Sequence, residues 1–293
     1  MSKLPRISSS IEGWARPVLI LLPYIFLTGI FQKVSFILLG FEINYSNLNS
    51  TPSQDLIIAS FTFVGTIVVV FIFRNFVDKK SFISIGFYPD NISKNIFFGI
   101  LLGALIITTT VIILTYIADI KWVGVELDFS NLAIYFLLFL VVGLGEEIFF
   151  RGYILNNLLL SMHRIFALIV SSIYFSLWHL PNEDFSFIAF INITFSGVLL
   201  GISYIYTKNL WMPIGLHLGW NFFQGSIFGF NVSGHHVYSL FRQSRISNTI
   251  WNGGVFGLEG SALLFVIQLI FIVGLLVYFN KNLKSQLSRV VCK

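Results

Sequence analysis

Hydrophobic residues in this chain form long runs that are separated by shorter polar segments. A helix needs about 20 mostly apolar residues to cross a lipid bilayer. Eight stretches approach this length: Pro17–Leu39, Leu56–Phe73, Ile96–Ala118, Leu132–Leu158, Ile165–Leu180, Phe187–Thr207, Trp211–Phe230 and Ala262–Phe279. The pattern predicts an all-α fold, a polytopic membrane helical bundle with about eight transmembrane helices.

The composition supports this interpretation and excludes other classes of protein. Of the 293 residues, 56% are hydrophobic and only 11% are charged. Soluble globular domains carry about 25% charged residues, so soluble enzymes, DNA-binding proteins and disordered proteins are excluded. The net charge of +5 is explained by basic loops beside the membrane and does not indicate nucleic-acid binding. The single cysteine, Cys292, cannot form a disulfide within the chain.

The sign of the charge alternates from one connection to the next. Basic residues lie in the N-terminal segment, the second, fourth and sixth connections and the tail: Lys3, Arg6, Arg16, Arg74, Lys79, Lys80, Lys94, Arg164, Lys208, Lys281 and Lys284. Acidic residues dominate the first, third and fifth connections: Glu42, Asp55, Asp119, Glu126, Asp128, Glu183 and Asp184. The long seventh connection is the exception, because it carries Arg242 and Arg245 against Glu259. Because basic loops stay on the cytoplasmic side, the pattern predicts an integral membrane protein with cytoplasmic N- and C-termini.

The chain divides into three parts. Residues 1–130 hold the first three predicted helices, residues 131–230 hold helices four to seven, and residues 231–293 hold an external loop, the last helix and a cytoplasmic tail. Glycines at four-residue spacing form the pairs Gly99/Gly103, Gly197/Gly201, Gly215/Gly219 and Gly225/Gly229. Such pairs let helices approach closely in lipid, and we expect them to serve packing inside the bundle.

Ionisable side chains inside the fourth predicted helix mark a candidate functional site, because such groups are costly in a membrane. Glu147 and Arg151 are four residues apart and share a helix face, which predicts an ion pair. Glu146 lies about 100° around the helix from Glu147 and lacks that partner. A carboxylate in this position is suited to act as a general base or acid.

Two further polar clusters fall on neighbouring helices. His179 ends the fifth predicted helix, and His217 and Asn221 share one face of the seventh. Counted from the turn near His163, Glu147 and His179 lie at similar depth. Each residue alone is explained by packing, but three clusters at compatible depth predict one pocket, in the cytoplasmic half or the middle of the bilayer.

The residue types in this pocket suit the activation of water. A glutamate and a histidine can deprotonate a water molecule directly or through a metal ion. The second histidine and the asparagine can donate hydrogen bonds to an oxyanion on a peptide carbonyl. Glu146, His179 and His217 are an acceptable set of zinc ligands with an open fourth position. The zinc-protease helix motif H-E-x-x-H is absent, so use of a metal stays open.

At these residues the sequence resembles the CPBP family, which comprises CAAX proteases and bacteriocin-processing proteins and is also called the Abi family. The family signature is E-E-x-x-x-R, then F-x-x-x-H, then H-x-x-x-N or D, on successive membrane helices. This chain has the three motifs in order: Glu146-Glu147…Arg151, Phe175…His179 and His217…Asn221. The resemblance covers about Leu132 to Phe230, so residues 131–230 are expected to form a CPBP-like catalytic core.

The resemblance implies an intramembrane endopeptidase of the CAAX-protease type. Glu146 and His179 would activate the water, and His217 and Asn221 would stabilise the oxyanion. Glu147, the second glutamate of the motif, counts with this catalytic set, while Arg151 and Phe175 give structural support. Family members are often described as metalloproteases, although a metal-free glutamate mechanism has been argued, so a divalent metal, zinc foremost, is an open expectation. A bacterial member would cut a membrane-associated peptide or protein in the cell membrane.

Other functions are compatible with the same helices. A non-catalytic bacteriocin-immunity or scaffolding protein would use them to bind partners. A proton-coupled transporter would use the carboxylates and histidines as a relay, but its repeats predict polar groups in both halves of the chain. His235 and His236 lie in the seventh connection and could form a second metal site. The competing interpretation of this segment is a solvated or re-entrant loop.

Overall fold

The computed structural model describes residues 11–41, 50–117, 119–245 and 248–291. Lys3, Arg6, Glu42, Ala118 and Cys292 lie outside these ranges. The helical elements are α1 (Ala15–Leu39), α2 (Pro52–Ile72), η2 (Phe73–Val77), η3 (Phe82–Ile85), α3 (Ile92–Tyr116), α4 (Phe129–Glu147), η4 (Ile148–Leu155), α5 (Asn156–Leu158), α6 (Arg164–Trp178), α7 (Phe187–Thr207), α8 (Trp211–Asn221), η5 (Phe222–Ile227), η6 (Gly254–Phe256), η7 (Leu258–Gly260) and α9 (Ala262–Val291). Two strands, β1 (Ile120–Val125) and β2 (Phe241–Arg245), complete the described fold.

Local hydrogen bonds explain where several of these helices begin. Thr51 and Gln54 form a capping box at the start of α2, in which each satisfies a backbone N–H of the other. The Asp128 side chain accepts from the backbone N–H groups of Ser130 and Asn131 and so caps α4. Ser186 caps α7 in the same way, through the N–H of Ala189. Polar residues between the apolar runs therefore set the helix boundaries.

Each of the eight predicted stretches is helical, but the number of membrane spans is not confirmed. Among the described residues six helices are long and apolar enough to cross a membrane. The fifth stretch forms only the 15-residue α6, and the seventh forms the 11-residue α8 followed by η5. Both short helices end at site residues, because α6 is capped at its C-terminus by His179 and α8 ends at Asn221.

Three helices continue into π-helical turns, in which hydrogen bonds reach one residue further than in an α-helix. These turns are η2, η4 and η5, and η4 follows directly after Glu147 and contains Arg151. The third, η5, follows directly after Asn221. Since π-turns in helices are often found at functional sites, the position of η4 and η5 beside the sequence motifs singles out the same region.

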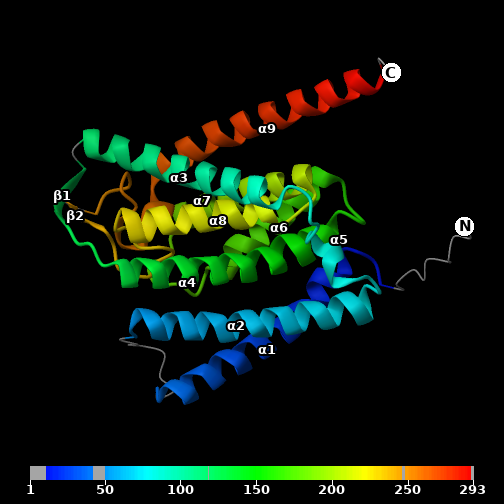
Figure 1. The fold of residues 1–293 in the computed structure, drawn as a ribbon, viewed down its shortest axis with the longest axis horizontal. Coiled ribbons are helices and arrows are strands. Elements are labelled where there is room, and N and C mark those ends of the chain that lie inside the picture. Colours follow the sequence, from blue (N-terminus) through cyan, green and yellow to red (C-terminus); the bar gives the residue numbers. More distant parts are fainter. Residues whose placement is uncertain (1–10, 42–49, 118, 246–247, 292–293) are drawn as a thin grey trace, which may run out of the picture.

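The helices pack around α8 and α4, as Figure 1 shows. The hairpin of α1 and α2 lies against α4. On the other side of the bundle α3 and α7 flank α8, and helix α9 lies beside α3 and α7. Strands β1 and β2 pair antiparallel at one end of the bundle, opposite the end that contains α5. The fold is therefore helical, as predicted, with one small sheet that the apolar runs did not indicate.

Glycines bring α3 and α8 into close contact. A Cβ atom on Gly99 would lie 2.3 Å from the Met212 carbonyl oxygen, and one on Gly219 would lie 2.4 Å from that of Ile100. Gly103 and Gly215 meet the opposite backbone in the same way. The expected role in helix packing holds for these two pairs. It does not hold for Gly225 and Gly229, because Gly225 meets Val237 of the seventh connection and Gly229 has a φ of +69° in a turn.

Replacement of Gly215 by Ala is expected to destabilise the protein, because the added methyl group would lie 2.4 Å from the Ile96 carbonyl oxygen and force α3 and α8 apart. Overpacking of this kind costs about 1–3 kcal/mol. Gly29 in α1 is the matched control, since a Cβ there meets nothing within 4 Å. Thermal unfolding in detergent should show a lower midpoint for Gly215→Ala and an unchanged or higher one for Gly29→Ala. Equal midpoints would contradict the close contact.

Candidate active site

A cavity of about 560 Å³ lies among α4, α6, α7 and α8. It is lined by all four residues that the sequence assigned to water activation and oxyanion binding: Glu146, His179, His217 and Asn221. The remaining wall is largely apolar, with Phe139, Phe175, Trp178, Leu216 and Trp220 among its residues. An apolar cavity with a few convergent polar groups is the usual form of a binding or active site.

Glu146, the penultimate residue of α4, directs its carboxylate into this cavity. Its side chain is 21% exposed, and its Oε2 atom lies 3.8 Å from His217 Nε2. Oε2 has no hydrogen-bond partner among the residues that the structure describes. A buried carboxylate oxygen without a donor costs free energy unless it binds something else. Glu146 is therefore free to take a proton from a water molecule or a substrate in the cavity.

Glu147 points away from the cavity and holds two other site residues. Its Oε1 atom accepts from Arg151 Nη1 at 2.8 Å and from His217 Nδ1 at 2.9 Å. The side chain is fully buried, as is that of Arg151, which also donates to the Gly197 carbonyl oxygen. The ion pair predicted from the four-residue spacing is present. Glu147 thus acts as a positioning residue for His217 and does not line the cavity.

The two histidines present the same ring atom to the cavity. His217 Nδ1 is paired with the Glu147 carboxylate, and His179 Nδ1 lies 2.9 Å from the Phe175 carbonyl oxygen. Because a carboxylate and a carbonyl can only accept, both Nδ1 atoms must carry a proton. Nε2 is therefore the atom of each ring that is available for chemistry.

Phe175 supports this arrangement from α6. Its ring lies 5.0 Å from the His179 ring and 6.1 Å from the His217 ring, in edge-to-face geometry. The Arg151 guanidinium carbon lies 4.2 Å from the centre of the same ring, as a cation–π contact. Phe175 therefore contacts members of all three motifs, which explains why an aromatic residue precedes His179 by one helical turn.

Asn221 completes the lining at the end of α8. The residue is 6% exposed, and no hydrogen bond of its side chain occurs among the described residues. Its amide is thus free to donate into the cavity. Gly143 of α4 faces α8 here, since a Cβ atom at that position would make ordinary van der Waals contact with His217 Cβ at 3.5 Å.

The predicted metal ligands have suitable chemistry but do not form a ready site. Zinc binds carboxylate oxygens and imidazole nitrogens, and its histidine ligands usually donate their second N–H to a carboxylate or carbonyl. His179 and His217 both make such a bond. Nevertheless, the described part of the chain contains no group of three His, Cys, Asp or Glu side chains arranged to hold a metal ion. The geometry of Glu146, His179 and His217 does not by itself fit a three-ligand metal site.

The seventh connection folds over the cavity and contributes to its wall. Ser233, His235, His236 and Glu259 all line it. The loop is held by Glu259, whose Oε2 accepts from the Ser233 backbone N–H at 2.6 Å and from Gln224 Nε2 at 3.2 Å. Burial raises the pKa of Glu259 above its ordinary value. The external loop expected from the sequence is therefore part of the site.

Sequence reasoning missed Asp55, Asn182 and Glu259 as lining residues. Asp55 and Glu259 are far along the chain from the motifs, and Asn182 lies in the connection that follows His179. Acidic and amide groups in connections are also typical of ordinary loops, so they gave no specific signal. The two histidines of the seventh connection, for which a second metal site was considered, face the same cavity as the motifs.

Comparison with known families agrees with the position of this cavity. Residues 128–223 match the family described as Rce1-like, type II CAAX prenyl endopeptidase. The matched segment runs from the N-cap of α4 to just beyond Asn221, so it contains all three motifs. The match confirms the resemblance to CPBP intramembrane proteases that the motifs indicated. It covers about a third of the chain and leaves out α1, α2, α3 and α9. No match is found among curated proteins.

Proposed function

We propose that this protein is an intramembrane endopeptidase that hydrolyses a peptide bond with a water molecule activated by Glu146 and His179. The observation that carries the proposal is the set of free polar atoms in one cavity. Among the described residues Glu146 Oε2 has no hydrogen-bond partner, both histidines have Nε2 free of hydrogen bonds, and the Asn221 amide makes no hydrogen bond. The match to the CAAX endopeptidase family supports peptide hydrolysis as the reaction.

In the first step the Glu146 carboxylate takes a proton from water as the oxygen attacks the peptide carbonyl. General-base catalysis of this kind contributes about 10²–10⁴-fold to the rate. His179 Nε2, which belongs to the same cavity lining, accepts a hydrogen bond from this water and orients it. The proton on Glu146 then passes to the nitrogen of the leaving amine, so that Glu146 returns to its ionised form.

The carbonyl oxygen becomes negatively charged in this step and needs hydrogen-bond donors. The Asn221 amide and His217 Nε2, when protonated, are the donors from α8. The hydrogen bond from Nδ1 of His217 to Glu147 fixes the ring in the orientation that this role requires. Donors that are already oriented lower the barrier by about 3–4 kcal/mol each.

The lining residues favour cleavage within a chain. Among the described residues that form the cavity, carboxylates are supplied by Asp55, Glu146 and Glu259, and none is a lysine or an arginine. A C-terminal carboxylate would find no lysine or arginine there, and the three carboxylates would disfavour it. The substrate is accordingly an internal segment of a membrane-associated peptide or protein, and the protein acts in a bilayer, that of a bacterial cell in our proposal.

The proposal is tested with the purified full-length protein in liposomes that contain a library of membrane-anchored peptides. The wild-type protein should release fragments, identified by mass spectrometry, and His179→Gln should lower the rate by about 10²–10⁴-fold because the water loses its orienting base. His163→Gln is the matched control, since His163 is exposed at the far end of α6. It should retain full activity.

Two arms of the same assay separate the alternatives. A chelator that abolishes hydrolysis, with recovery on addition of zinc, would establish the metal-bound form of the water, whereas unchanged rates would establish the metal-free form. The absence of any product, or equal rates for the wild type and His179→Gln, would overturn the protease proposal and leave a non-catalytic scaffolding or immunity protein.

A further inference from the structure

The two ends of the helix bundle are built from different connections. At one end, the third, fifth and seventh connections meet: β1 pairs with β2, Asn182 Nδ2 donates to the Ser233 carbonyl oxygen, and Thr249 Oγ1 donates to Asp119. The cavity extends to this end, because Ser50, Asn182 and His236 are among its lining residues. Its mouth is therefore formed by the odd-numbered connections.

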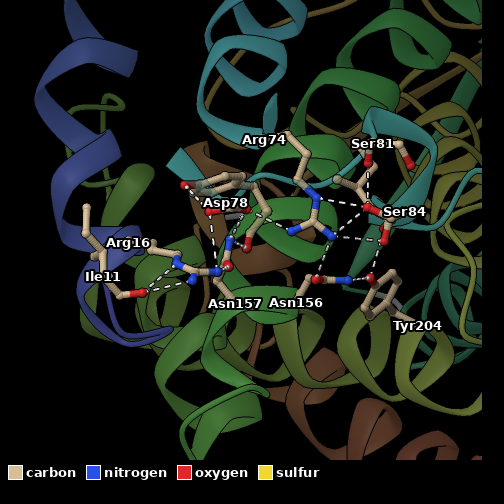
Figure 2. Close-up of polar contacts among 11 residues, drawn as sticks. Ile11, Arg16, Arg74, Asp78, Ser81, Ser84, Asn156, Asn157 and Tyr204 are labelled. Atoms are coloured by element: carbon tan, nitrogen blue, oxygen red, sulfur yellow. Dashed lines mark hydrogen bonds and ion pairs between the residues drawn. The ribbon is translucent and has the colours of Figure 1, made fainter. Parts of the chain in front are cut away.

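The opposite end is closed by a buried polar cluster, shown in Figure 2. Arg74 pairs with Asp78 at 2.8 Å, and Asp78 also accepts from Asn157 Nδ2 at 3.1 Å. Arg16 Nη1 donates to Asn157 Oδ1, so the start of α1 is joined to α5. These contacts join the even-numbered connections, and none of the described residues that line the catalytic cavity lies in them.

The sixth connection belongs to the same cluster. Arg74 Nη2 donates to Asn156 Oδ1, Asn156 Nδ2 donates to the Tyr204 hydroxyl, and that hydroxyl donates to the Ile85 carbonyl oxygen. The Leu210 backbone N–H donates to the Gly86 carbonyl oxygen. The second, fourth and sixth connections thus form one continuous surface at the end opposite the cavity mouth.

Charge divides between these two ends. The closed end carries most of the basic residues that the structure describes: Arg16, Arg74, Lys79, Lys80, Lys94, Arg164, Lys208 and Lys281. The end with the mouth carries most of the described carboxylates: Asp55, Asp119, Glu126, Asp128, Glu183, Asp184 and Glu259. In membrane proteins the basic short loops remain in the cytoplasm. The closed end is then cytoplasmic, and the mouth faces away from it.

We propose that the cavity opens to the extracytoplasmic face of the membrane, so that its substrate is a peptide segment exposed on that face: an exported peptide or an outer segment of a membrane protein. The nature of the substrate rests on the proposed protease function. The direction of the opening does not depend on it. It also differs from the cytoplasmic-half location that the sequence indicated, because the motif residues lie deep while the opening above them is made by the odd-numbered connections.

The experiment measures the labelling of single cysteines in the full-length protein, which is expressed in bacteria that are then converted to protoplasts. Cys292→Ser removes the native thiol, and single cysteines are then introduced as Ser244→Cys and His236→Cys at the mouth and Ser161→Cys at the closed end. The three positions are exposed, and none belongs to the catalytic set. Each variant is treated with a membrane-impermeant maleimide, before and after permeabilisation with detergent.

We expect Ser244→Cys and His236→Cys to be labelled in intact protoplasts, and Ser161→Cys to be labelled only after permeabilisation. The reverse pattern would overturn the proposal. Labelling of Ser244→Cys without His236→Cys would also overturn it, since the cavity would then be closed to that face. Because labelling requires no catalysis, a chain that labels as expected but cleaves no peptide would contradict the protease function alone.

Discussion

Glu146→Gln is expected to abolish peptide hydrolysis and leave the helix bundle intact. Glutamine matches glutamate in size, so the cavity keeps its shape, but an amide cannot accept the proton of the attacking water. The loss should be about 10²–10⁴-fold in kcat, the usual contribution of a general base. Stability should not fall, because Glu146 Oε2 has no hydrogen-bond partner in the folded protein. The rate of fragment release and the unfolding midpoint are measured on the same sample.

Glu147→Gln is the informative comparison, because it changes the adjacent residue in the same chemical way. Glu147 accepts from both Arg151 and His217, so its replacement removes charge from two buried hydrogen bonds. It should lower stability as well as activity. If Glu146→Gln kept wild-type activity, or if Glu147→Gln alone abolished it without loss of stability, the assignment of the base to Glu146 would be wrong.

The inactive Glu146→Gln protein also offers a way to identify the substrate. A protein that has lost the base but keeps its cavity should still bind the segment that it would otherwise cut. Crosslinking from the cavity mouth, at His236, would capture that segment in the membrane. Wild-type protein under the same conditions should retain less of it, since it releases products.

The helices and the site residues could be predicted from the sequence because both depend on short-range patterns. Each of the eight apolar runs coincides with a helix, although only six of the described helices are long and apolar enough to cross a membrane. Four-residue spacing placed Glu147 with Arg151. The scarcity of charge made Glu146 conspicuous: few ionisable groups lie within the helices, and three of them fall between Glu146 and Arg151.

Features that depend on long-range contacts could not be predicted. The fifth and seventh apolar runs do not form α-helices of full membrane length: α6 has 15 residues, and α8 continues as the π-turn η5 directly after Asn221. Burial of Glu259 by Ser233 and Gln224 joins segments that no local pattern relates. The π-turn after Glu147 likewise has no signature in composition. Each feature is decided by which other element packs against it.

Arg151→Met is expected to cause the largest loss of stability of any single change in the core. Arg151 is 1% exposed, and its guanidinium contacts Glu147, the Gly197 carbonyl oxygen and the Phe175 ring. Methionine fills much of the space but leaves the Glu147 carboxylate without its cation. Removing one partner of a buried ion pair costs about 3–5 kcal/mol. Equilibrium unfolding in mixed micelles measures the difference.

The double variant Glu147→Gln with Arg151→Met decides whether charge or packing is responsible. Replacing both members of a buried ion pair by neutral groups is often close to neutral, so stability should return towards the wild-type value. Activity should not return, because His217 Nδ1 would no longer face a carboxylate. Arg151→Lys should fall between, since it keeps the charge but not the planar group that lies over Phe175. A double variant as unstable as Arg151→Met would show that shape, and not the ion pair, makes Arg151 necessary, and Glu147 would then serve His217 alone.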